Sequence, residues 1–446
     1  VIAAVCAVCQ CSPRTPPQGD SRMSDHTSAA TAAAGHTASG LNHRLLRMTG
    51  RDPHESGRVA TPLELLFDLA FVAAFGIAGN QMAHLLAEGH IGPAIGGFAF
   101  GLFAITWAWV NFTWFASAFD TDDWFYRITT MVQMVGVVVL ALGLSDVFHS
   151  LDEGHGLNNG VMVAGYVVMR VAMLTQWLRL AVQSPQYRKT ALTYAQWIAI
   201  AQVGWVVLAV LHLDLLPTMA VAGVLYLVEL GGPVLAERRA KAPWHPHHLA
   251  ERYGLLVIIS LGEGVLGTIA AVQPIIADQG WSDDAIVLVT AGVVLTFGMW
   301  WAYFAAPFAD LLHRNQGAAF AFGYLHIIVF GAIAAVGAGL HVAAYVLEGE
   351  AHVGFNEAVR AVAIPVAIFL VAYFVIYSIM VRGVDVFHFV LFILSMGFLV
   401  LAVVLTGTGT PFALDILLVS AAPWVVVVGF ETVGHKHAEG HLARLS

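Results

Sequence analysis

The sequence predicts an all-α membrane protein, a polytopic bundle of about twelve transmembrane helices. Of its 446 residues, 59% are hydrophobic and only 11% are charged, whereas a soluble domain carries about 25% charged residues. The mean hydropathy is +0.76, and apolar runs recur at roughly the 20 residues that a helix needs to cross a bilayer. These few charged residues are too few to cover the surface of soluble domains of this total length. The outer surface of the folded chain is therefore expected to face lipid.

The composition and the missing motifs also bound the function. The net charge is −9 and the basic residues are scattered, so no nucleic-acid partner is expected. The sequence has no phosphate loop, no dinucleotide fingerprint, no Gly-x-Ser-x-Gly and no His-Glu-x-x-His. We therefore expect no catalytic residue, cofactor or metal, and we expect the bilayer and a small solute or ion as partners. The oligomeric state stays open.

Residues 1–50 are predicted to form a disordered tail, because they are rich in Ala, Thr, Ser and Pro and lack a periodic apolar pattern. The three cysteines of the chain lie there: Cys6, Cys9 and Cys11. No further ligands at metal-site spacing accompany them, and the rest of the chain has no thiol. Met23 and Met48 both resemble natural starts, so residues 1–22 are a candidate extension beyond the native protein.

Windows of about 19 residues predict twelve spans. They lie near 62–86, 92–117, 124–148, 158–182, 191–212, 215–236, 247–273, 284–308, 317–346, 356–381, 385–406 and 411–434. The odd-numbered connectors contain Asp and Glu but neither Lys nor Arg, whereas the even-numbered connectors and both tails hold most of the basic residues. The positive-inside rule then places both termini in the cytoplasm, which requires an even number of spans.

Similar residues recur in the two halves of the membrane region at a spacing of roughly 190 residues, which we call the echo. Glu64 and Glu251 open the first span of each half, the aromatic second spans run to Asp120 and Asp310, and the fourth spans carry Arg170 and Arg360. Such an echo suggests a parallel repeat of the kind found in several carriers, although hydrophobic composition alone also produces matches. We predict two six-helix halves, 51–240 and 241–436, and a cytoplasmic tail over 437–446.

Ionisable residues at membrane depth are functional candidates, because each costs about 2.5 to 3.5 kcal/mol to insert. Glu263 lies near the predicted bilayer centre between Gly262 and Gly264. It is either a carboxylate that loads and releases a proton or a protonated side chain that ties two helices together. His326 in the ninth span is either a proton relay or a hydrogen-bonded core histidine.

Several other charged residues are predicted to meet inside the bundle. On a helix, His248, Glu251, Arg252 and Glu263 share one face. Glu64 and Asp68 are one turn apart, so they share a proton or meet a cation. The available cations are Arg127, Arg170, Arg179 and Arg252. Arg170 lies in the middle of its span and must pair with a buried acid, either Asp68, Glu229 or Glu263, whether the pairing is functional or only structural.

A cytoplasmic connector carries the residues Asp120, Asp122, Asp123 and Arg127. Asp122 or Asp123 could simply cap the third span. Alternatively these acids and Arg127 form a gate, with Asp310 and Arg314 as its counterpart in the second half.

The second span carries Asn111 and Thr113 among three tryptophans: Trp107, Trp109 and Trp114. This pattern suits a polar patch in an aromatic wall, as a solute pocket needs, or ordinary interfacial anchoring.

Three motifs resemble the bacterial low temperature requirement A family over residues 50–436. They are Leu63-Glu-Leu-Leu-Phe-Asp-Leu-Ala-Phe71, Trp114-Phe-Ala-Ser-Ala-Phe-Asp-Thr-Asp-Asp123 with Tyr126-Arg127, and His248-Leu-Ala-Glu-Arg-Tyr-Gly-Leu with Leu261-Gly-Glu263. Leu66 stands where the family pattern has a second Phe. The resemblance implies a multi-pass protein of the bacterial inner membrane connected with growth at low temperature. It brings no substrate or mechanism with it.

Three functions fit these observations. A secondary transporter, proton-linked through Glu263, accounts for the echo and the buried charges. A membrane scaffold or sensor that supports growth in the cold needs the charges only for packing. An enzyme acting on lipid would have Glu64 and Asp68 as its acid-base pair. A water path to Glu263 favours the first, a dry interior with paired charges the second, and a lateral opening beside Asp68 the third.

Overall fold

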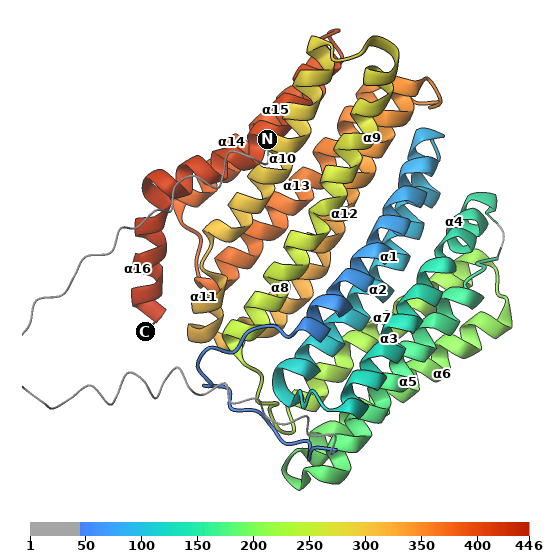
Figure 1. Ribbon diagram of the computed structural model, residues 1–446, viewed down its shortest axis with the longest axis vertical. Coiled ribbons are helices and arrows are strands. Elements are labelled where there is room, and N and C mark those ends of the chain that lie inside the picture. Colours follow the sequence, from blue (N-terminus) through green and yellow to red (C-terminus); the bar gives the residue numbers. More distant parts are fainter. Residues whose placement is uncertain (1–44, 155, 446) are drawn as a thin grey trace, which may run out of the picture. The chain divides into compact units, whose positions relative to one another are not determined.

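The computed structural model describes residues 45–154 and 156–445, whose regular structure is entirely helical (Figure 1). Within them, twelve segments are long and apolar enough to cross a membrane, as predicted. The first six spans are α1 (Pro62–Ala87), α2 (Ile91–Phe119), α3 (Trp124–Leu142) with α4 (Leu144–Glu153), α5 (Gly160–Gln183), η1 (Pro185–Tyr187) with α6 (Arg188–Leu211), and α7 (Leu215–Glu237). The last six are α8 (Pro246–Ser260) with α9 (Gly262–Gln279), α10 (Asp283–Ala305) with α11 (Phe308–Arg314), η2 (Gln316–Ala318) with α12 (Ala319–Glu348), α13 (Phe355–Met380), α14 (Val386–Thr406), and α15 (Phe412–Gly429) with the π-helical turn Phe430–Gly434 and α16 (His435–Leu445).

Local signals in the sequence explain where the spans begin. Thr61 caps α1 in a capping box with Glu64, and Pro62 takes the first helical position. The start of α8 is built alike, with the side chain of His245 as the cap and Pro246 in the first position. We call the end of the bundle that holds these two starts the basic end, and the opposite end, where α1 and α9 finish, the acidic end.

The seventh span changes helix at its midpoint. Helix α8 ends at Ser260 and α9 starts at Gly262, so Leu261 separates them. Glu263 therefore lies in the first turn of a new helix and halfway along the span.

Helix α12 forms the centre of the described bundle and is its most buried span. It packs against α9 and α13 of the second half and against α1 and α2 of the first (Figure 1). In each half, neighbouring spans pack in the same succession, α1 on α2 and α3 and then α3 on α5, as α9 on α10 and α12 and then α12 on α13. The contact between the halves thus runs along α1, α2, α8 and α12.

Two predicted tails are partly ordered. Residues 45–50 were predicted to belong to the N-terminal tail, but Met48 is fully buried and its backbone N–H donates to Gln183 Oε1 at 2.7 Å. The predicted tail over 437–446 instead continues the last span as α16, which His437 fastens to Asp385 at 2.6 Å. The three cysteines lie outside the described residues.

Candidate functional site

An aromatic cavity lies between four helices of the first half, α2, α5, α6 and α7, and α12 of the second half. Its walls enclose about 390 Å³, the open mouth included. The lining residues are Trp107, Val110, Asn111, Trp114, Trp177, Tyr194, Pro233, Glu237, Ala242, Phe320 and Tyr324. They run from Ala242, in the α7–α8 connector at the basic end, to Trp107 in the middle of α2.

Ring contacts hold the walls of this aromatic cavity in place. Trp177 of α5 stacks on Tyr194 of α6 with ring centroids 4.0 Å apart. Trp114 of α2 stacks on Phe320 of α12 at 5.4 Å, and its indole N–H donates to the hydroxyl of Tyr253 at 3.1 Å. The contacts of Trp114 join helices of both halves, so a movement of one half against the other would reshape the cavity.

The cavity continues inward to a buried polar cluster, which we call the charged floor. The deeper section shares Asn111 and Tyr194 with the aromatic cavity and is bounded by Arg170 and Glu229. Arg170 donates to Glu229, and both side chains are 2% exposed. Of the three acids predicted for Arg170, the structure therefore selects Glu229.

The carboxylate of Glu229 accepts hydrogen bonds from three further donors, on α2, α5 and α6. The Trp107 indole donates at 2.9 Å, the Tyr166 hydroxyl at 3.0 Å and the Gln202 amide at 3.4 Å. Arg170 is less well satisfied, because its Nε and Nη1 are buried without a hydrogen-bond partner among the described residues. Buried polar atoms are rarely left unpaired, so the floor retains unused capacity to bind water or a ligand.

A second buried cluster joins α1 to α8 at the basic end. Arg252 contacts Glu64 at 2.7 Å and Asp68 at 2.5 Å, and His248 lies 3.4 Å from Glu64. Asp68 also accepts the indole N–H of Trp109 at 2.7 Å. The predicted cation for Glu64 and Asp68 is thus Arg252, and all of these groups are fully buried.

The predicted shared face on the seventh span points towards α1. Besides His248 and Arg252, the Glu251 carboxylate accepts the Ala60 backbone N–H at 3.4 Å. Glu251 is half-buried and does not contact Glu64.

The caps of α1 and α8 give one way to align these two helices. His245 and Thr61 are 184 residues apart, and the same separation relates His248 to Glu64. In this alignment His248 takes the position of Glu64, and Arg252 takes that of Asp68. Glu251 lies three residues further into its helix than Glu64, so the predicted match of Glu64 with Glu251 belongs to a different alignment and stays a prediction.

Glu263 faces the contact between the halves without a partner. A methyl group on Gly76 of α1 would fall 2.6 Å from Glu263 Oε1, and one on Gly337 of α12 would fall 2.9 Å from its Cβ. Glycine at these two positions thus makes room for the side chain. Glu263 is partly exposed and has no hydrogen-bond partner among the described residues.

The connector between α2 and α3 combines a helix cap with ion pairs. Asp123 caps α3 and pairs with Arg179, as the capping alternative predicted. Partial burial raises the pKa of Asp123, but the hydrogen bonds from Arg179 and from the Tyr126 backbone outweigh it and leave the pKa lowered. Asp122 pairs instead with Arg127 at 2.7 Å on the surface.

Asp120 behaves differently from its neighbours. Burial, reinforced by the nearby charge of Glu64, raises its pKa to about 6. Its carboxylate accepts the Asp122 backbone N–H at 2.8 Å and lies 3.5 Å from Arg51.

The predicted counterpart of this connector in the second half is not formed. Asp310 and Arg314 are both exposed and do not pair, because Arg314 instead donates to the Leu442 carbonyl at 2.7 Å. His326 is a buried histidine 2.9 Å from the Tyr303 hydroxyl, and its Nδ1 lies 2.6 Å from the Phe322 carbonyl.

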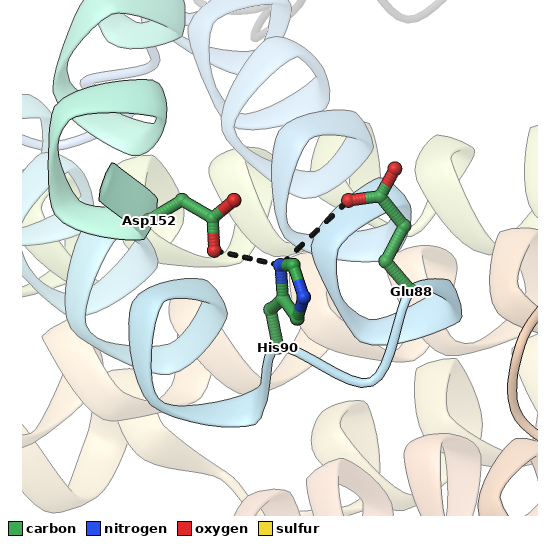
Figure 2. Close-up of side chains that lie close together, drawn as sticks. All are labelled: Glu88, His90 and Asp152. Atoms are coloured by element: carbon green, nitrogen blue, oxygen red, sulfur yellow. Dashed lines mark ion pairs between the residues drawn. The ribbon is translucent and has the colours of Figure 1, made fainter. Parts of the chain in front are cut away.

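A surface cluster at the acidic end brings together Glu88, His90 and Asp152, the types of side chain that can hold a metal ion (Figure 2). His90 Nδ1 lies 2.7 Å from Asp152 and 3.8 Å from Glu88. The three side chains are 25% to 49% exposed, which is the ordinary setting of a surface ion pair.

A groove of about 1620 Å³, its open side included, lies between α1, α2, α12 and α13. Apart from Glu357 and Arg360, its lining is almost entirely apolar. Lipid chains suit such a surface, so the aromatic cavity is the better candidate for a polar ligand.

Sequence reasoning identified Asn111, Trp107 and Trp114 as a possible pocket wall but did not find the rest of the site. Thr113 is buried outside the cavity lining. Glu237, Tyr194 and Tyr324 were missed because each lies near a helix end, where acids and aromatic residues are common. The packing of α6 on α7 brings Tyr194 to Glu237, and Tyr324 of α12 reaches α7 by donating to the Leu230 carbonyl at 2.9 Å.

Comparison with known proteins matches residues 59–423 to the family described as Bacterial low temperature requirement A protein (LtrA). An uncharacterised protein of Rhizobium meliloti (strain 1021) is 27% identical over 289 residues, which are 60% of this chain and 66% of that protein. No solved structure matches the chain. Because the family match covers most of the membrane body, the chain belongs to the bacterial low temperature requirement A family.

Proposed function

We propose that this protein is a secondary transporter. The observation that carries the proposal is the aromatic cavity, which lies where the first half meets α12 and ends on Arg170 and Glu229 in mid-span. Carriers bind their solutes near the midplane at such an interface, and rocking of the halves then exposes the site alternately. With the basic end in the cytoplasm, as the distribution of Lys and Arg predicts, the cavity opens inwards.

Glu263 is the proposed proton-coupling residue. Glu64, Asp68, Asp123 and Glu229 each pair with an arginine, whereas Glu263 has neither a counter-ion nor a hydrogen-bond donor among the described residues. A carboxylate without a counter-ion at this depth gains or loses a proton when its surroundings change. It lies against α1 and α12 of different halves, so relative motion of the halves would change those surroundings.

Neither alternative function accounts for these features as well. A scaffold would need the buried charges only for packing, and the paired clusters fit it, but it gives no reason for the cavity or for unpaired Glu263. A lipid enzyme would need Glu64 and Asp68 to be accessible, and both are fully buried against Arg252.

Transport can be tested with the Glu263→Gln variant in proteoliposomes loaded with a pH-sensitive dye. Gln keeps the shape of a protonated Glu, so we expect normal folding but no solute-dependent proton movement. The matched control is Glu251→Gln, which removes a half-buried carboxylate from the same span. Solute-driven proton flux that persists unchanged in Glu263→Gln would refute the coupling role. No flux in the wild type with any of a broad solute panel would favour the scaffold.

A further inference from the structure

We infer that the aromatic cavity binds a small organic cation, an alkylammonium or quaternary ammonium group. This inference rests on the proposed transport function, for which it supplies the substrate class. The ring lining, the charge of the lining and the state of the floor each favour a cation.

The rings supply the first argument. Six of the eleven lining residues are aromatic: Trp107, Trp114, Trp177, Tyr194, Phe320 and Tyr324. Aromatic faces carry negative partial charge, and cages of such rings bind ammonium groups. An ammonium with methyl or alkyl substituents suits this lining better than a hydrated metal ion, because its apolar surface loses little hydration on entering.

Charge supplies the second argument. Glu237 is the only charged side chain of the outer section of the cavity. Its carboxylate is held by neutral donors, the Tyr194 hydroxyl at 3.1 Å and the Ala242 backbone N–H at 2.9 Å. Lys241, in the connector after α7, acts on Glu237 through its charge but forms no ion pair with it among the described residues. Glu237 therefore has no bound counter-ion, and its charge would attract a cation and repel an anion at the entrance.

The charged floor formed by Arg170 and Glu229 does not reverse the preference of the cavity for a cation. Arg170 is positive, but it is bound to Glu229, so the two sections together keep the single negative charge of Glu237. Asn111 lines both sections, and its amide nitrogen is already used on the Trp107 carbonyl at 2.8 Å. Its amide oxygen remains to accept an N–H from a primary or secondary ammonium.

Binding can be measured by calorimetry on the purified full-length protein with three probes of similar size. These are tetramethylammonium, the neutral tert-butanol and the anion pivalate. We expect binding of tetramethylammonium only. Glu237→Gln and, separately, Trp114→Leu should each weaken it about tenfold or more. The matched control is Trp300→Leu, which removes an exposed tryptophan outside the cavity and should leave the affinity unchanged.

Two results would overturn the inference. One is binding of pivalate in preference to tetramethylammonium, and the other is tetramethylammonium affinity that neither cavity variant changes. Trp114→Leu keeps the test decisive if Glu237→Gln fails to fold. Failure of the transport proposal looks different: the cation binds to the purified protein, but proteoliposomes neither accumulate nor exchange it. Transport of another solute without cation binding would overturn the substrate class alone.

Discussion

The two halves of the bundle solve the problem of burying polar groups in different ways. In the first half, charged Arg170 and Glu229 lie at mid-depth among donors from α2, α5 and α6. In the second half, the described parts of the fourth and sixth spans hold no such ion pair, because Arg360 is exposed and the buried Asp415 accepts the Thr410 hydroxyl at 2.7 Å. The buried polar contact between α10 and α12 is the neutral pair Tyr303 and His326. Equal helix number and similar packing therefore do not imply equal roles. In the transporter that we propose, the first half carries the binding chemistry, and the second half contributes α12 as a wall and Glu263.

The largest expected effect comes from breaking the charged floor with Glu229→Ala. Removing the acid leaves Arg170 buried without its counter-ion, which should lower the free energy of unfolding by about 3 to 5 kcal/mol. Chemical denaturation in mixed micelles measures the loss. The double variant Arg170→Met/Glu229→Leu should recover much of it, because neither charge is then left alone. If Glu229→Ala lowered the free energy of unfolding by less than about 1 kcal/mol, the charged pair would matter no more for stability than a neutral pair.

The next effect concerns pH and compares Asp120 with Asp310, its predicted counterpart. The pKa of Asp120 is raised from 3.8 to about 6 by burial, so the folded protein holds a proton that the unfolded chain has released between these values. Stability should therefore fall as the pH rises from about 4 to 6, by up to about 3 kcal/mol, and then level off.

Unfolding of the wild type, Asp120→Asn and Asp310→Asn across this pH range measures that difference. Asp120→Asn should remove this part of the dependence, whereas Asp310→Asn should follow the wild type because Asp310 is exposed. Identical curves for Asp120→Asn and the wild type would contradict the raised pKa.

The smallest effect is expected in the polar core of the second half. His326→Phe replaces a neutral ring with another ring and leaves the Tyr303 hydroxyl without its partner, at a cost of about 1 to 3 kcal/mol. The same denaturation assay should place this variant well above Glu229→Ala in stability. If His326→Phe were the more destabilising of the two, the contrast between the halves would be wrong.

Most of the fold was predictable because the bilayer restricts what a chain can do. Apolar runs of the right length can only be helices there, so the twelve spans follow directly from the sequence. The caps were also visible, since Thr61-Pro62 and His245-Pro246 are local signals. The break at Leu261 was not, because Gly262, which follows it, belongs to a residue type that is common inside membrane helices.

The partners of the buried charges were only partly predictable. Insertion cost says that Arg170 must meet an acid, but choosing Glu229 over Asp68 requires knowing that α5 and α7 enclose one space. The sequence comparison matched Glu251 with Glu64 by residue type, whereas an alignment on the helix caps places His248 opposite Glu64. The aromatic cavity depends on contact between distant segments such as α2 and α12, about which local sequence carries no information.

The order of synthesis determines when the buried charged cluster between α1 and α8 can form. Glu64 and Asp68 are each 184 residues ahead of their partners His248 and Arg252. Ribosomes add about 5 to 20 residues per second, so α1 waits roughly 10 to 40 s for the seventh span. Both acids lie in the first two turns of α1, near the membrane surface, where waiting with an uncompensated charge costs least. Helix formation itself takes microseconds, so translation, and not folding of the helices, paces the assembly of this protein.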